Sequence, residues 1–386
     1  MRTPKALAFY LPQFHPIPEN DRWWGKGFTE WRNVAKARPR FPGHYQPHIP
    51  ADLGFYDLRM PEIQAEQAAL ARQYGIHGFC YYHYWFTGKR LLERPVDQLL
   101  RLGQPDFPFC LCWANENWSR TWDGHDKLLL AEQKYSAEDD EAHIRSLIPV
   151  FKDPRYIRVK DRPLFLVYRT SHLPDPAATF ARWRKIVTAA GLPGLYLANV
   201  ECFGSEHGLA SRYELDAAVE FAPDWHTLPP AVPLLGHSPV QRVLRKLGKS
   251  DPARDNQLVF EYPELVKNML SKPTPSYVRF PCVTPSWDNS ARKKAGARIF
   301  RGSTPELYES WLNRALARFQ PPTPGEDFVF INAWNEWAEG NHLEPCLQWG
   351  HGYLEATARA LRSAAGQDPL EARVSPVQAG ATTVST

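Results

Sequence analysis

The chain has 386 residues, with 46 basic and 42 acidic side chains and a formal net charge of +4. This small excess, with no block of about five or six like charges, argues against a nucleic-acid partner. No apolar run reaches the roughly eighteen residues that a membrane span needs, and the first residues lack the apolar core and cleavage site of a signal peptide. We therefore expect a cytoplasmic protein with no membrane span.

The composition is rich in aromatic residues, with 14 Trp, 16 Tyr and 20 Phe, and many tryptophans stand beside Asn, Asp, Glu or Arg. A ring with a polar neighbour suits sugar binding, because the ring packs on C–H groups while the neighbour hydrogen-bonds hydroxyls. Core filling is the alternative for any single tryptophan. The six cysteines lack CxxC spacing and fall mostly in apolar runs, which favours buried free thiols.

Eight short apolar runs alternate with amphipathic stretches along the chain, a pattern typical of strands and helices in turn. Each run is apolar at consecutive positions, which favours strands buried on both faces of a parallel sheet. The runs span residues 6–14, 75–85, 107–118, 163–170, 195–201, 216–225, 278–288 and 327–337.

The intervening segments predict helices at about 60–75, 136–151, 175–191, 304–319 and 353–366, several of which open with Ser, Thr or Asp as an N-cap. Eight such units predict an α/β fold, a (β/α)8 barrel of the TIM type, as a single domain over residues 1–363. The tail, 364–386, is rich in Ala, Gly, Ser, Thr and Pro, and we expect it to be disordered. The alternative, an open doubly wound sheet, is weakened because no Gly-rich phosphate loop follows the first run.

Polar and aromatic residues gather where the runs end. In a barrel these ends share one rim, where active sites are built, so we expect the side chains to converge on one cleft. Two long connections, 15–60 and 226–262, are expected to cover this rim. The predicted substrate-binding residues are Tyr10, His83, Trp85, Trp113, Asn115, Glu116, Trp118, Trp287, Asp288, Trp334 and Asn335.

Two glutamates, Glu336 and Glu339, follow the eighth run in the stretch INAWNEWAEGNHLEP. If the turn is helical, this spacing puts both on one face, where two close carboxylates acquire different pKa values. Such a pair suits glycosidic-bond chemistry, with one group as acid and the other as nucleophile or base. Acidic residues in a first helical turn also favour the helix dipole, so a purely structural role stays open on spacing alone.

Several of these motifs resemble known families. NEWAEG resembles the NEWxEG-type motif of glycoside hydrolase family 99, the endo-acting α-mannosidases and α-mannanases. FYLPQFH, WWGKGFTEW, GFCYYHYWF and WANENW more closely resemble the WbsX-like family of O-antigen and polysaccharide biosynthesis, usually labelled glycosyltransferase. That resemblance covers roughly residues 5–360.

The resemblance to family 99 implies roles for the two glutamates. Glu336 would deprotonate the sugar 2-hydroxyl to give a 1,2-anhydro intermediate, and Glu339 would act as general acid and then base, with overall retention. Ala338 departs from the hydrolase motif, which carries His at this position.

Three functions from different classes stay open: a family 99-type hydrolase acting on an α-mannoside-like link, a glycosyltransferase for a cell-surface polysaccharide, and a non-catalytic glycan-binding barrel. We expect a glycan substrate and, for a transferase, a sugar donor. The absence of HExxH or paired histidine spacing favours a protein with neither metal nor cofactor. Arg120 and Arg169 are expected to pair with rim carboxylates or to meet an anionic sugar or phosphate.

Overall fold

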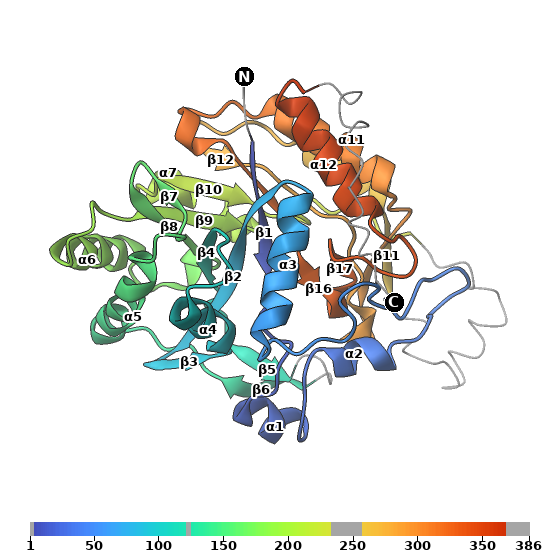
Figure 1. Ribbon diagram of the computed structural model, residues 1–386, viewed down its shortest axis with the longest axis horizontal. Helices are drawn as coiled ribbons and strands as arrows, with labels where there is room; N and C mark the ends of the chain where they lie inside the picture. The colour runs from blue at the N-terminus through green and yellow to red at the C-terminus, as the bar shows by residue number, and fades with distance from the viewer. Residues whose placement is uncertain (1–3, 121–124, 233–256, 368–386) are drawn as a thin grey trace, which may run out of the picture.

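The computed structural model describes residues 4–120, 125–232 and 257–367, and its centre is a nearly closed barrel of parallel strands (Figure 1). All eight apolar runs contain barrel strands, which confirms the predicted fold. The strands are β1 (Lys5–Tyr10), β2 (Ile76–Phe86), β4 (Phe109–Trp113), β8 (Arg162–Val167), β9 (Tyr196–Glu201), β10 (Ala217–Glu220), β12 (Arg279–Phe280), β13 (Cys282–Val283) and β15 (Phe328–Ile331).

The seventh run forms two short strands rather than one. β12 pairs with β10, while β13 pairs with β15, so the barrel closes through this single segment. Pro281 separates the two pieces; it has no N–H to donate, but its carbonyl accepts a hydrogen bond from Phe330 N at 2.8 Å. The break therefore leaves the sheet connected on both sides.

Helices connect the strands, and the predicted ones form close to the expected bounds. Their predicted N-caps are made by Ser136, Asp175 and Thr304, each of which accepts a hydrogen bond from a backbone N–H three residues on. The helices that follow the eight barrel strands are α3 (Pro61–Gln73), α4 (Arg94–Leu102), α5 (Ala137–Phe151), α6 (Pro176–Ala189), α7 (Leu209–Arg212), α10 (Tyr262–Ser271), α11 (Pro305–Arg318) and α12 (Gly352–Ala364).

The barrel interior is filled with aromatic side chains. The ring of Phe9 in β1 lies 5.5 Å from Tyr82, 5.5 Å from Phe330 and 5.7 Å from Phe221, so strands from different sides of the barrel meet at its axis. Neighbouring residues point the other way: Tyr10 packs on Phe79 and donates a hydrogen bond to Gln67 of α3. This two-residue alternation decides which side chains can reach the rim.

Several segments are inserted between strands and helices. The connection after β1 carries α1 (Pro18–Trp24) and α2 (Trp31–Lys36), and the one after β4 carries the hairpin of β5 (Trp118–Arg120) and β6 (His125–Ala131). Figure 1 shows these insertions together at the lower end of the view. The remaining short strands are β3 (Lys89–Leu91), β7 (Arg158–Val159), β11 (Leu258–Glu261), β14 (Arg298–Arg301), β16 (Asn335–Glu336) and β17 (Asn341–His342).

Other predictions have mixed outcomes. The six cysteines are buried free thiols, as predicted. Most of the expected tail and residues 233–256 of the second long connection lie outside the described residues. Within the described part of the chain, no helix has the length and apolar character required to cross a membrane.

Candidate active site

A cleft of about 370 Å³ lies at the carboxyl end of the barrel. Residues from the carboxyl-terminal half of β2 and from beyond the ends of the other seven strand segments line it, so all eight segments contribute to one rim. In chain order, these strand ends contribute Leu11, Tyr82, Glu116, Tyr168, Phe203, Trp225, Trp287 and Glu336, among others. Asn20 and Trp24 of α1 also line the cleft, as expected for a wall built from the first long connection.

The loop after β15 carries the two glutamates. β16 pairs with β17, and between them residues Trp337–Glu339 form a 3-10 helix, η6. Residues i and i+3 are eclipsed in a 3-10 helix, which brings Glu336 and Glu339 to the same side. Gly340 ends the turn in the left-handed conformation at φ 56°, where a Cβ would lie 3.0 Å from the Cβ of Asp288.

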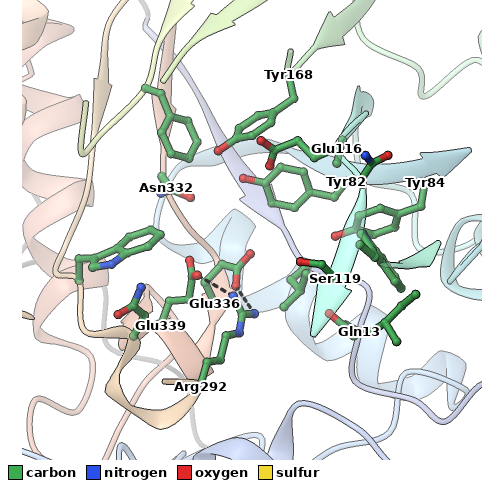
Figure 2. A pocket seen from close by; sticks show the side chains of 18 of the residues that line it. Gln13, Tyr82, Tyr84, Glu116, Ser119, Tyr168, Arg292, Asn332, Glu336 and Glu339 are labelled. Atoms are coloured by element: carbon green, nitrogen blue, oxygen red, sulfur yellow. Dashed lines mark hydrogen bonds and ion pairs between the residues drawn. The ribbon is translucent and has the colours of Figure 1, made fainter. Parts of the chain in front are cut away.

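Arg292 holds both glutamates with one guanidinium (Figure 2). Its NH2 lies 3.0 Å from Glu336 Oε2, and its NH1 lies 2.6 Å from Glu339 Oε1. The remaining Nε faces Glu30, at the start of α2, with a distance of 3.1 Å to Oε2. Three carboxylates thus share one cation, and all four side chains are at most 17% exposed.

This arrangement keeps protons on the site. Burial raises the pKa of Glu336 to about 8 and also raises the pKa of Glu339, although Arg292 acts in the opposite direction on both. The charge of Glu30 adds to the increase in each case. Because the two glutamates are coupled, the proton belongs to the pair. Both carboxyl groups therefore hold a proton more strongly than an ordinary glutamate does.

Glu116, Trp118 and Trp287 are the other predicted residues that line the cleft. Trp287 packs edge-on against Trp225, with ring centroids 4.9 Å apart. Trp118 packs against Tyr84 and Phe86. Aromatic walls of this kind are compatible with a sugar ligand.

The structure places three other predicted residues outside the cleft. His83 lies 3.0 Å from the ring nitrogen of His143, and Trp85 stacks on that histidine and donates to Asp139. Trp113 packs between His143 and Trp183 of α6. All three side chains pack against helices α5 and α6 and do not line the cleft, because they lie on the outer face of their strands. On β2, Tyr82 and Tyr84 face the cleft instead.

Four further predicted residues pack behind the loop that carries Glu336 and Glu339. Asn335 accepts a hydrogen bond from Leu11 N at 2.7 Å and donates to Leu11 O, which joins the loop to β1. Trp334 is fully buried against Phe79, and Tyr10 faces α3. Asp288 accepts from His44 Nε2 at 2.6 Å, and its backbone N–H donates to the carbonyl of Glu339. These residues position the loop rather than line the cleft.

Asn115 is also a brace. Its side chain accepts a hydrogen bond from Arg169 N and donates to Arg169 O, both at 2.8 Å. The Arg169 guanidinium pairs with Glu116 at 2.5 Å and with Glu206 at 3.0 Å, which is the predicted pairing with a rim carboxylate. The side chain of Arg120 lies outside the described residues.

A buried carboxylate, Glu344, supports the loop from below. It accepts hydrogen bonds from Gln67 and Trp337, both at 2.6 Å, and from Tyr56 at 2.9 Å. Burial raises the pKa of Glu344 to about 7 against the effect of these donors. The ring of Trp337 in turn stacks on His342 at 3.7 Å.

Glu30 and Arg292 were missed from the sequence. Glu30 stands in WWGKGFTEW and Arg292 in NSARKK, and both come from insertions whose distance from the glutamates cannot be read from strand periodicity. The one available signal for Glu30 was its place in a motif that carried the family resemblance. Among the described residues, no group of three or more His, Cys, Asp or Glu side chains is arranged to hold a metal ion.

The barrel and its aromatic, acidic cleft support a carbohydrate-active enzyme. The chain belongs to the family "Glycosyltransferase WbsX", whose sequence model matches residues 6–357. It is 47% identical over 359 residues to the uncharacterized protein WxcX of Xanthomonas campestris pv. campestris, in strain B100 and in strain ATCC 33913. The match covers 93% of this chain, which spans about half the length of those relatives (50%).

Solved structures show the same fold. A "glycoside hydrolase-like protein" aligns with a TM-score of 0.56 and 13% identity, over 94% of each chain. The GH99 endo-α-mannosidase from Bacteroides thetaiotaomicron, in complex with BIS-TRIS-propane, aligns with a TM-score of 0.54 and 15% identity, over 95% of this chain and 98% of the other. At such low identity these likenesses concern the fold alone.

Proposed function

We propose that this chain cleaves or transfers a glycosidic bond of a cell-surface polysaccharide or O-antigen glycan with retention of configuration, through Glu336 and Glu339. The observation that carries the proposal is the sharing of Arg292 by both carboxylates inside the cleft, at 3.0 and 2.6 Å. A pair in which one carboxyl is protonated and the other is ionised can donate to a leaving oxygen and accept from a hydroxyl in the same step.

In the proposed reaction, Glu336 takes the proton of the sugar 2-hydroxyl while that oxygen attacks the anomeric carbon. The glycosidic bond breaks, and Glu339 gives its proton to the leaving oxygen. Glu339 then removes a proton from the incoming water or acceptor hydroxyl, which attacks the anomeric carbon and opens the 1,2-anhydro ring, and Glu336 returns its proton to the 2-oxygen. Two inversions at the same carbon give net retention.

Burial and Arg292 have different effects in this scheme. Burial raises the pKa values of both carboxyls, so that a proton is available at neutral pH. Arg292 stabilises the carboxylate that forms when the acid gives up its proton. Tyr82 and Tyr168 stand across the cleft from the pair (Figure 2), where their hydroxyls can bind the sugar ring.

A glycosyltransferase is the second candidate, and the description of the family as a glycosyltransferase favours it. In that case an acceptor sugar hydroxyl takes the place of water in the second step. The α-mannoside preference suggested by the NEWAEG motif applies to either candidate.

The experiment that tests the proposal offers the protein α-mannoside oligosaccharides in one reaction and nucleotide-sugar donors with an acceptor glycan in another, with products identified by mass. Release of sugar in the first reaction alone supports a hydrolase. Extension in the second supports a transferase. No product from any offered glycan, with the protein folded and glycan-binding, would favour a non-catalytic glycan-binding barrel.

A further inference from the structure

Arg298 is a second arginine of the cleft, at the first position of β14. Its guanidinium lies 4.8 Å from the ring centroid of Trp225, which also lines the cleft. Arg292 meets three carboxylates, but among residues 4–120, 125–232 and 257–367 no carboxylate comes within ion-pair distance of Arg298. Its charge therefore lacks a counter-ion in this part of the chain.

The position of Arg298 is fixed by its backbone. Its N–H donates to Asn289 Oδ1 at 2.9 Å, and the N–H of Phe300, two residues on, donates to Trp287 O at 2.8 Å. β14 also pairs in parallel with β11, with Arg298 opposite Leu258. The arginine is thus held on a strand beside the cleft, which lowers the entropy cost of binding a ligand there.

Trp287 provides a second donor without an acceptor at the same end of the cleft. Its side chain is 5% exposed, and its Nε1 has no hydrogen-bond partner among the described residues. A buried N–H without an acceptor destabilises a protein, so such groups are rare and call for an explanation. Trp287 also contacts Trp225, so the two rings and the guanidinium form one continuous surface.

We propose that Arg298, Trp225 and Trp287 form a subsite for an anionic group, a carboxylate or a phosphate, carried by the glycan or by its sugar donor. The proposal rests on the proposed function and names the substrate class of that site. A guanidinium presents a planar fork of donors that matches the oxygens of either anion, and the indole N–H adds a further donor. The aromatic face of Trp225 backs the guanidinium and leaves its edge for the ligand.

Binding of matched probes tests this subsite. Titration calorimetry would compare the affinity for mannuronic acid di- and trisaccharides with the affinity for their carboxyl-reduced counterparts. Separate titrations would measure the binding of inorganic pyrophosphate and of nucleoside diphosphates. We expect at least one anionic set to bind, and Arg298→Met to weaken that binding by about tenfold or more, as for loss of a charge-assisted hydrogen bond. Arg298→Lys should restore part of the affinity, and added salt should reduce it.

The matched control is Arg301→Met on the same strand, which removes a cation that pairs with Glu261 outside the cleft and should leave binding unchanged. A preference for uronic acids assigns the subsite to a glycan carboxylate, and a preference for diphosphates assigns it to a donor. Anion binding that is absent, or equal in wild type and Arg298→Met, overturns the subsite. Turnover of an anionic glycan that needs Glu336 and Glu339 but is unchanged in Arg298→Met would overturn the subsite and leave the proposed function intact. Anion binding that depends on Arg298, without turnover of any glycan, would support the subsite and contradict the proposed function.

Discussion

The substitution Glu30→Gln tests the electrostatics of Glu336 and Glu339, the proposed catalytic pair. Glu30 is fully buried and lies 3.1 Å from Arg292 Nε, whereas the two glutamates approach the other two nitrogens of the guanidinium. Its charge raises the pKa of both Glu336 and Glu339. Neutralising Glu30 removes that repulsion and leaves Arg292 to the pair, so both pKa values should fall.

The magnitude follows from the shared guanidinium. Glu30 and Glu336 approach its nitrogens at 3.1 and 3.0 Å. If the two oxygens are taken to be about 7 Å apart, a unit charge contributes about 2.4 kcal/mol at a dielectric constant of about 20 and about 0.6 kcal/mol at about 80. The expected decrease is therefore between about 0.4 and 1.7 pKa units.

Carbon-13 NMR of δ-labelled glutamate measures this directly, since carboxyl shifts report protonation and the Gln variants at 336 and 339 assign the signals. Glu19→Gln is the matched control, because Glu19 lies in the same insertion but pairs with Lys89. Carboxyl titrations that are identical in wild type and in folded Glu30→Gln would refute the coupling. A decrease of similar size in the Glu19 variant would show that the effect is not local.

Two other substitutions test separate parts of the account. Glu344→Gln should change the pH dependence of stability: the folded-state pKa of Glu344 is raised to about 7 from an ordinary value of 4.5, so the wild type loses stability as pH rises from about 4.5 to 7. The melting temperature of the Gln variant relative to wild type should thus increase from pH about 4.5 to 7. A melting-temperature difference that stays constant over this range would contradict the prediction. Trp118→Ala should weaken glycan binding by about tenfold because a stacking ring is lost from the cleft. Trp85→Phe, which changes the contacts with Asp139 and His143 outside the cleft, should leave binding unchanged, and equal losses in both variants would contradict the assignment.

The fold was predictable because each βα unit is specified by residues that are close together in the sequence. Runs such as FCLCW in β4 are buried at every position, and Ser136 or Thr304 mark helix starts through their own hydrogen bonds. The barrel then follows from repetition of the unit. Residues 278–288 were treated as one run, and the split at Pro281 was not predicted because the pairing of its two pieces depends on strands distant in the chain.

Among the predicted site residues, those beyond the strand ends line the cleft more often than those within the strands. Glu336, Glu339 and Trp287 follow their strands, and the loops carry them to the cleft. Within β2 the run is apolar on both faces, so nothing in it separates His83, which faces a helix, from Tyr82, which faces the cleft. The same ambiguity does not affect the fold, because both faces of a barrel strand are buried.

Glu30 and Arg292 illustrate a second limit. They lie 262 residues apart in the chain and meet because two insertions fold over the same rim. Local sequence patterns predict where an insertion begins, but not which of its side chains reaches the cleft. The pKa values of the catalytic pair depend on these two residues, so the electrostatics of the site could not be derived from NEWAEG alone.

The most direct test of the central claim is the turnover rate of wild type, Glu336→Gln and Glu339→Gln on whichever glycan the product assay identifies, with melting temperatures measured on the same samples. Each substitution keeps the size of the side chain but removes its ability to exchange a proton. We predict that both variants stay folded and lose turnover by about 10²- to 10⁴-fold, the usual contribution of general acid–base catalysis. Near wild-type turnover in both folded variants would contradict the assignment of Glu336 and Glu339 as the catalytic pair.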